Sequence, residues 1–449
     1  VFISACCILF GFGAKAGCFP LHIWLPQAHA VAPAPASALL SGILTKSGMY
    51  GVLLIAIHIF CGNVLWGELM MVLGAITMFL GALLAIFSVD LKRTLACSSM
   101  SQIGFILTGV AMYTFMGEEG ILAARGTFLH MMNHSLIKLV LFMVAGVVYM
   151  NLHELDFNQI RGYGKGKPFL MIAYLMGALG IGGIPLWNGY VSKTLIHEGI
   201  LECIEEAHEF GLNASMLHAD EWIFLISGGM TIGYMTKIFV MLFLDQPSEY
   251  VKHHDHGDYM NKVSAAVIGF SAIILPVLGM TPNITMDGLA SFTRGFFEVE
   301  LPHHAIHYFS FANLKGALIS LAISIFVYFV IIRLIMMGKD ENGEVVYKNL
   351  WPDWLSLETL VYRPILWPYL YGFFLRIPDQ LTDSLISLLR KTIFRDLRRK
   401  DNKILKSELA QKVYKHDYAT ELVFTTLSFG LLMAGLGMVF VMVYLFILF

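Results

Sequence analysis

Charged residues are scarce in this sequence. Only 14% of its 449 residues are Asp, Glu, Lys or Arg, whereas 57% are hydrophobic, and the mean hydropathy is +0.69. Soluble domains carry about 25% charged residues, so the composition excludes an ordinary soluble protein. A formal net charge of -2 gives no indication of nucleic-acid binding.

Metal and redox motifs are lacking as well. The six cysteines form no CxxC pair and no Cys/His metal spacing, and the sequence has no flavin, nucleotide, iron–sulfur or quinone motif. We therefore interpret the cysteines as small apolar core residues and expect no cofactor in this chain. The sequence begins at Val1 inside an apolar run, without a signal-peptide pattern, so we expect further residues upstream.

Apolar runs dominate what is present. About ten of them are long enough to cross a bilayer, which takes roughly 20 residues. Basic residues gather in alternate loops and glutamates in the others, so the positive-inside rule places segment 339–419 in the cytoplasm and both ends of the chain outward. The sequence thus predicts an all-α polytopic membrane protein with spans at 2–18, 36–60, 67–89, 93–115, 121–150, 168–197, 222–245, 261–281, 314–338 and 420–448.

Segment 339–419 is too polar to span a membrane. Residues 351–378 are rich in Trp, Tyr and Pro, which is typical of the headgroup interface. Residues 379–400 place apolar side chains at helical spacing opposite a basic face, which predicts an amphipathic lateral helix. Either anionic lipid or a neighbouring subunit could cover its apolar face, formed by Leu381, Leu385, Leu388, Leu389, Ile393 and Leu397.

The run 168–197 contains residues that a plain membrane helix avoids. Pro185 has no N–H group, so with Gly182 and Gly183 it predicts a break in the helix. Backbone groups freed inside a membrane are tolerated only where protein or water satisfies them. Lys193 lies near the end of this run, and a buried lysine costs about 2.5–3.5 kcal/mol. It is either part of a functional site or a lysine that reaches the interface.

Other cations lie within the apolar runs. Lys15 precedes Pro20, which predicts a break in the first run, and Lys46 lies near the middle of the second. Lys237 lies nearer the cytoplasmic end of its span, so its role is more ambiguous. The sequence FPLHIW of the first broken run is echoed by IPLW of the sixth, and paired broken helices indicate a transporter built from two repeats.

Three titratable residues share one helix face. His130, His134 and Lys138 lie at positions i, i+4 and i+8, each one turn from the next. Since imidazole both accepts and donates protons near neutral pH, the row predicts a proton relay. The spacing of the two histidines also permits a metal ion, but no further ligand supports one. The histidines at 253, 254 and 256 lie in a predicted loop and are interpreted as solvated.

Five motifs resemble a known family. They are KAGCFPLHIWLPQAH, ILTKSGMYG, DLKRTLACSSMSQIGF, HMMNHSLIKLVLF and GIPLWNGYVSK, and their order and spacing resemble the antiporter-like membrane subunits of the complex I superfamily. That superfamily includes respiratory NADH:quinone oxidoreductase, energy-converting hydrogenases, formate hydrogenlyase and Mrp-type antiporters. The resemblance extends to about residue 245, and beyond it only the layout of the spans is similar.

The resemblance implies roles for individual residues. Lys15 resembles the proton-binding lysine of the first broken helix, with His22 near the entry side, and Lys46 resembles the connecting lysine. The row from His130 to Lys138 resembles the central polar axis, and Lys193 the terminal residue. About six helices that the family has upstream are not in this sequence, among them one whose glutamate pairs with the first lysine.

The resemblance also implies an organisation in an inverted-repeat fold. Residues 1–60 would be the rest of a first antiporter-like repeat and 61–245 a second one. Residues 246–338 would add transmembrane helices, 339–419 the interfacial and lateral segment, and 420–449 the last helix. The implied location is the cytoplasmic membrane of a prokaryote, beside other antiporter-like subunits.

The implied function is proton translocation driven by electron transfer elsewhere in a complex. Iron–sulfur clusters and other redox centres would then belong to partner subunits, and this chain itself would hold no redox-catalytic residue. One alternative is an Mrp-type subunit that exchanges Na⁺ for H⁺. Another is a scaffold subunit with vestigial charges, against which the retained lysines and the histidine row argue.

Overall fold

The structure is a computed structural model of the whole chain. It describes residues 1–117, 120–209, 214–255, 257, 259–292, 306–339 and 345–352, with residues 356, 359, 360, 364 and 384 beyond them. The lateral helix predicted at 379–400 and the span predicted at 420–448 lie outside the described residues. Contacts divide the chain into Val1–Leu357 and Glu358–Phe449, and the fold below is that of the first unit.

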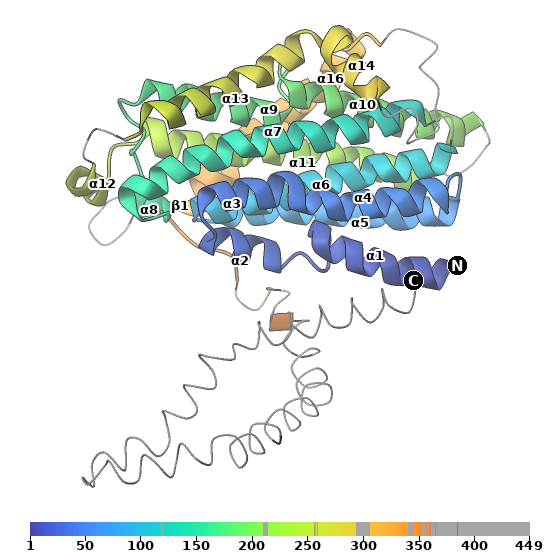
Figure 1. Cartoon of the computed structure of the whole chain (residues 1–449), viewed down its shortest axis with the longest axis horizontal. Coiled ribbons are helices and arrows are strands. Elements are labelled where there is room, and N and C mark those ends of the chain that lie inside the picture. The colour runs from blue at the N-terminus through green and yellow to red at the C-terminus, as the bar shows by residue number, and fades with distance from the viewer. Residues whose placement is uncertain are drawn as a thin grey trace, which may run out of the picture. The chain divides into compact units, whose positions relative to one another are not determined.

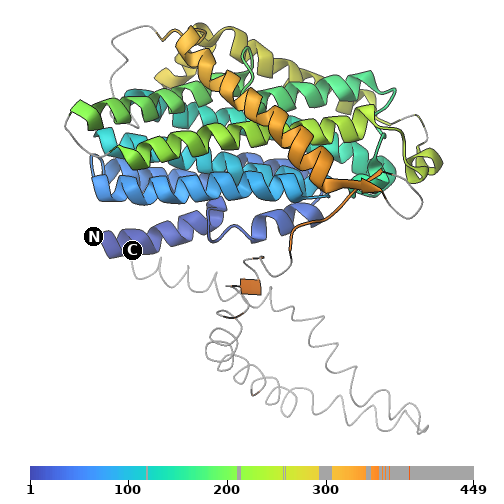
Figure 2. The same ribbon diagram turned by 180° about the vertical axis from the view of Figure 1, so that it is seen from behind.

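Helices account for almost all of the described regular structure (Figures 1 and 2). Seven helical stretches in the described part of the chain are long and apolar enough to cross a membrane, which agrees with a polytopic membrane protein. They are Ala34–His58, Val64–Phe87, Leu91–Met116, Ile121–Leu152, Ser215–Leu244, Lys262–Met280 and Phe311–Met336.

The elements follow one another with short connections. In chain order they are α1 (Phe2–Ala16), α2 (Trp24–Val31), α3 (Ala34–Leu39), the π-helical segment η1 (Leu40–Leu44), α4 (Thr45–His58), α5 (Val64–Phe87), α6 (Leu91–Met116), α7 (Ile121–Leu152), α8 (Phe157–Ile160), α9 (Pro168–Gly182), α10 (Asn188–Glu209), α11 (Ser215–Phe239), the π-helical η3 (Val240–Leu244), α12 (Glu249–His254), α13 (Lys262–Met280), α14 (Pro282–Ser291), α16 (Phe311–Phe326), the π-helical η4 (Val327–Met336), β1 (Met337–Lys339) and β2 (Val345–Tyr347).

Helix α6 lies at the centre of the unit, and every residue of its most apolar stretch is buried. It packs closely against α5, because a Cβ atom at Gly104 would lie 2.3 Å from the backbone nitrogen of Met78. Small residues let membrane helices approach in this way. Helix α7 packs on α6, and α10 packs on α7. Seen from behind, residues 311–336 cross the neighbouring helices obliquely (Figure 2). The site described below is built around α6, α7 and α10.

Both predicted breaks are present. Helix α1 ends at Ala16, with Gly17 in the left-handed region (φ 82°), and the chain turns before α2. Helix α9 ends at Gly182 and α10 begins at Asn188, so the break covers the predicted Gly–Gly–Ile–Pro sequence. A left-handed glycine is a common C-terminal cap because it has no Cβ atom to clash.

One feature was not predicted from the sequence. Strands β1 and β2 form a short antiparallel pair that pairs Met337 with Tyr347. Two hydrogen bonds connect β2 to Asn158 of α8. The Asn158 amide donates to the Tyr347 carbonyl (3.1 Å), and its Oδ1 accepts from the Tyr347 N–H (2.7 Å). The domain boundaries predicted at 60 and 245 stay predictions.

Candidate functional site

Lys46 and His134 meet in the interior. The Lys46 ammonium contacts Nδ1 of His134, and it donates to the Ser41 carbonyl at 2.7 Å. Ser41 belongs to η1, in which the widened helix presents a carbonyl to side chains, and π-helical turns are frequent at functional sites. Lys46 is 8% exposed and His134 1%. The two residues are 88 positions apart in the sequence, so only the fold brings them together.

Lys138 lies one turn of α7 beyond His134. Its ammonium donates to the Leu95 carbonyl of α6 (2.6 Å) and to the Ser98 hydroxyl. The next residue, Ser99, shares a hydrogen bond of 2.7 Å with the Ser41 hydroxyl. Two neighbouring hydroxyl groups of α6 therefore link the two lysines. The Ser98 hydroxyl accepts from Lys138, and the Ser99 hydroxyl bonds to Ser41, whose carbonyl accepts from Lys46.

His130 lies one turn of α7 on the other side of His134 and has a partner at each ring nitrogen. Nδ1 lies 3.0 Å from the Ser192 hydroxyl, and Nε2 lies 3.1 Å from Oε1 of Gln102. The Ser192 hydroxyl also accepts from the Asn133 amide at 3.1 Å and lies 3.2 Å from the Gly189 carbonyl. The histidine is thus held between α6 and α10.

Lys193 binds a backbone carbonyl at the C-terminal end of helix α9. At its C-terminus the N–H groups of Gly183 and Ile184 bond back to Gly180 and Leu179, which leaves the Ile181 carbonyl free. The residue that would bond it in a continuing helix is Pro185, which has no N–H. The Lys193 ammonium donates to this carbonyl at 2.9 Å. A cation at a helix C-terminus is stabilised by the helix dipole, so the break and the lysine form one site.

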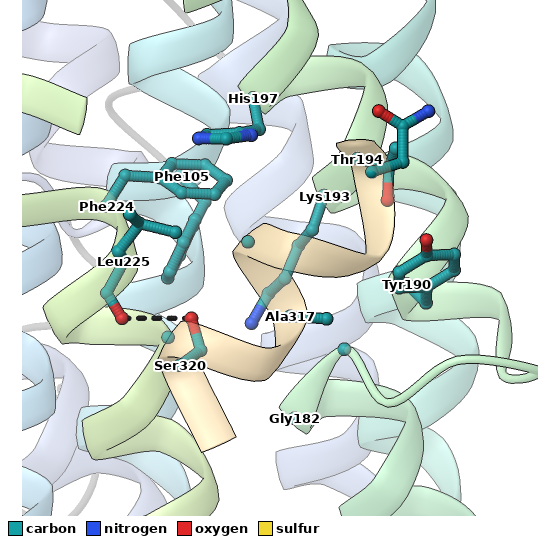
Figure 3. Close-up of a pocket in the computed structure, with 14 residues that line it drawn as sticks. Phe105, Gly182, Tyr190, Lys193, Thr194, His197, Phe224, Leu225, Ala317 and Ser320 are labelled. Atoms are coloured by element: carbon teal, nitrogen blue, oxygen red, sulfur yellow. Dashed lines mark hydrogen bonds between the residues drawn. The ribbon is translucent and has the colours of Figure 1, made fainter. Parts of the chain in front are cut away.

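A small cavity adjoins Lys193 (Figure 3). Its volume is about 40 Å³, and its walls come from α6, α9, α10, α11 and α16. The ammonium lies 4.4 Å from the centre of the Phe105 ring, and the centre of the His130 ring lies 5.9 Å from the centre of the same ring. Phe105 therefore lies beside both Lys193 and His130.

Lys237 is fully buried, but it contacts neither the histidines nor Lys193. Its ammonium donates to the carbonyls of Ala85 (3.2 Å), Ile86 (2.6 Å) and Ser88 (2.7 Å). These are the last carbonyls of α5, which have no partner within the helix. In this position the lysine caps α5, and its predicted role in proton transfer stays a prediction.

Lys15 and His22 lie apart from the central groups. The sequence reading counted Lys15 among the buried charges, whereas its side chain is exposed on α1. The reason is that α1 turns its other face to α4, where a Cβ atom at Gly48 would lie 2.5 Å from the backbone nitrogen of Ala16. His22 is 3% exposed and stacks near the Phe19 ring at 6.0 Å. Their predicted roles in proton transfer stay predictions.

Neutral dipoles hold four of the buried lysines. Within the described ranges no carboxylate forms an ion pair with Lys46, Lys138, Lys193 or Lys237, whose partners are carbonyls, a hydroxyl and an imidazole. An ion pair would fix a lysine in its charged form, whereas dipoles can solvate the ammonium and leave it able to release a proton.

The described residues contain no group of three or more His, Cys, Asp and Glu side chains that could hold a metal ion.

Several residues of the site were missed in the sequence. Ser192 and Gln102 are short polar side chains that are common in membrane helices, and nothing in their spacing indicated that they bond to His130. His29 is fully buried and stacks on Phe142 at 4.7 Å. A histidine within a short apolar helix was the available signal for His29.

Comparisons with known proteins agree with this architecture. Residues 1–210 match the family model described as NADH:quinone oxidoreductase/Mrp antiporter, TM. Hydrogenase-4 component B of Escherichia coli is 36% identical over 247 residues, which cover 53% of this chain and 36% of that protein. Formate hydrogenlyase subunit 3 of Escherichia coli is 34% identical and covers 53% of this chain and 40% of that protein. NAD(P)H-quinone oxidoreductase chain 4 1 of Synechococcus sp. is 32% identical and covers 61% and 49%.

Solved structures show the same fold. A chain of the Mrp complex from Dietzia sp. has a TM-score of 0.58 at 21% identity, covering 66% of this chain and 60% of that one. A chain of respiratory complex I from Thermus thermophilus has a TM-score of 0.54 at 21% identity, covering 65% and 57%.

The chain spans between 36% and 49% of the length of the three curated relatives. The matched part contains the broken helices, the row on α7, Lys46 and Lys193, and its helices make this an integral membrane protein. Over residues 1–210 this chain is similar to the antiporter-like membrane subunits of the complex I superfamily.

Proposed function

We propose that this chain is a proton-translocating subunit of a redox-driven complex I-like assembly. The observation that carries the proposal is the contact between Lys46 and His134, with His130 one turn further along α7 and bonded to Ser192, the residue beside Lys193. Residues one turn apart on a helix have Cβ atoms about 5–6 Å apart. Groups that can accept and donate protons therefore follow one another from α4 through α7 to α10.

The surroundings of His130 suit a relay. Oε1 of Gln102 only accepts, so in the neutral ring Nε2 donates to it and Nδ1 accepts from the Ser192 hydroxyl. When the ring carries a second proton, Nδ1 donates to the Ser192 oxygen, and the hydroxyl turns to the Gly189 carbonyl. Both ring nitrogens of His130 keep a partner in both states. His130 can thus gain and lose a proton without leaving either of its own ring nitrogens unsatisfied, which would cost about 1–3 kcal/mol.

The membrane arrangement is part of the proposal. It comprises about ten transmembrane helices, two of them broken, in one part of an inverted-repeat fold in a prokaryotic cytoplasmic membrane. The lateral segment lies on the cytoplasmic side, Lys15 faces that side, and Lys193 lies toward the outside. The partners are other membrane subunits, including further antiporter-like ones. The redox centres, with iron–sulfur clusters among them, belong to those partners.

A second candidate function is Na⁺/H⁺ exchange of the Mrp type, which the structural likeness to a chain of an Mrp complex favours. The two functions differ in what drives the proton. Sealed vesicles that contain the full-length protein with its copurifying subunits are given either an electron donor or a pulse of Na⁺, and a pH-sensitive dye reports proton movement. We expect a pH gradient with the electron donor in Na⁺-free buffer. A gradient that forms only with the Na⁺ pulse would replace the redox-driven function with exchange.

A further inference from the structure

A second row of titratable side chains leads away from Lys193. His197 lies four residues after Lys193 on α10, and both line the same cavity (Figure 3). The His197 ring stacks on Phe224 of α11 at 5.7 Å. Gly316 of α16 leaves room for the imidazole, because a Cβ atom there would lie 3.4 Å from Cε1 of His197. Two helices and a glycine thus fix the ring at the edge of the cavity.

Glu221 links this histidine to a second one. Its Oε1 lies 3.6 Å from Nε2 of His197, and its Oε2 lies 3.6 Å from Nδ1 of His218, which is three residues earlier on α11. These distances suit ion pairs and exceed a direct hydrogen bond, so a small side-chain rotation brings either pair into bonding range. The carboxylate therefore bridges the two imidazoles.

Exposure rises step by step along this row. Lys193 is 7% exposed, and the side chains of His197, Glu221 and His218 are 14%, 21% and 49% exposed. His218 also lies close to His208 of α10, with 5.8 Å between the ring centres. The row therefore begins at the buried lysine and ends at the surface where α10 ends and α11 begins.

The cavity can bridge the gap between Lys193 and His197. A water molecule needs about 10–15 Å³ of such space, so a volume of about 40 Å³ holds roughly three. The Ser320 hydroxyl and the Asn313 side chain add polar groups to its wall. Water molecules in this cavity would connect Lys193 with His197, since both residues line it.

We infer that His197, Glu221 and His218 form a proton branch between Lys193 and the surface, an inference that rests on the function proposed above. In each passage the Lys193 ammonium gives one proton to water in the cavity, which passes one proton to His197. Glu221 and then His218 take up and release a proton in turn. One proton leaves the lysine, one appears at the surface, and the three relay residues regain their starting states.

Glu221→Gln is the main test. Glutamine has the same shape and still forms hydrogen bonds, but it cannot carry the proton. We expect the translocation rate per assembled complex, measured by dye in sealed vesicles, to fall at least tenfold. Glu221→Asp should recover a substantial part of the rate because it restores a titratable group. The control is Glu205→Gln, which changes an exposed glutamate of α10 and should leave the rate unchanged.

The outcomes separate this inference from the function on which it rests. If Lys193→Ala stops translocation while Glu221→Gln runs at the normal rate, the branch is wrong and the proposed function stands. If Lys193→Ala also runs normally, the proposed function itself fails. Equal losses in the Gln and Asp variants would show a structural role for Glu221 and overturn the branch. Should the Glu221 variants fail to assemble, His197→Gln gives the same comparison, and a normal rate there refutes the branch.

Discussion

Gly183→Ala perturbs the hydrogen bond between Lys193 and the end of α9 without altering the lysine itself. Gly183 has φ of 73°, and a Cβ atom there would lie 2.9 Å from Cδ of Lys193. The left-handed conformation costs a residue with a Cβ atom about 1–2 kcal/mol. In addition, the lysine stem must move away from the half-helix end, which weakens its bond to the Ile181 carbonyl. A hydrogen bond to a charged group contributes about 1.5–3 kcal/mol.

Gly166→Ala is the matched control. Gly166 has a similar φ of 81°, but nothing lies within 4 Å of the position a Cβ atom would take. Both variants should lose about 1–2 kcal/mol of stability through backbone strain, measured by thermal unfolding in detergent. Only Gly183→Ala should also slow proton translocation in vesicles, by about tenfold or more, since 1.4 kcal/mol corresponds to a factor of ten. Equal translocation rates in the two variants would refute the assignment of the α9 end to Lys193.

Three further variants test other contacts. Ser192→Ala removes the hydroxyl that bonds to His130 in both protonation states. Translocation in vesicles should fall by about tenfold, because one hydrogen bond of roughly 1.5 kcal/mol is lost. An unchanged rate would exclude the hydroxyl from the relay. Asp287→Asn removes the charge that pairs with buried Arg125 at 2.6 Å, and thermal unfolding should show a loss of about 1–3 kcal/mol; equal stability would show that the pair contributes nothing. Lys237→Met leaves the last carbonyls of α5 without a donor and should lower the unfolding temperature, and a normal unfolding temperature would contradict the cap.

The sequence predicted those parts of the fold that depend on local chemistry. Pro185 and its neighbouring glycines mark the helix break because proline cannot donate a hydrogen bond, and the break lies at that position. The i, i+4, i+8 spacing predicted that His130, His134 and Lys138 share a helix face, and all three are buried on α7. Periodicity and residue chemistry suffice for such features, because each is decided within a few turns of helix.

The sequence could not predict which distant groups meet. The partner of His134 is Lys46, 88 residues away, and it is presented beside a π-helical segment that no local pattern indicated. Ser192 was missed because a hydroxyl on a buried helix face has no distinctive spacing. Lys15 was grouped with the buried cations because it lies in an apolar run, but the packing of α1 on α4 decides which face is covered. Tertiary packing, which spacing does not encode, determines all three.

Lys193→Ala in the assembled complex tests the central claim most directly. The variant removes the ammonium that bonds to the end of α9, lines the cavity and lies beside Phe105, the ring next to His130. The break between α9 and α10 remains. In sealed vesicles supplied with the electron donor, we expect electron transfer to be measurable and proton translocation to be abolished, with Lys193→Arg as a variant that keeps the charge but cannot release its proton. Translocation by Lys193→Ala at the normal rate would contradict the account.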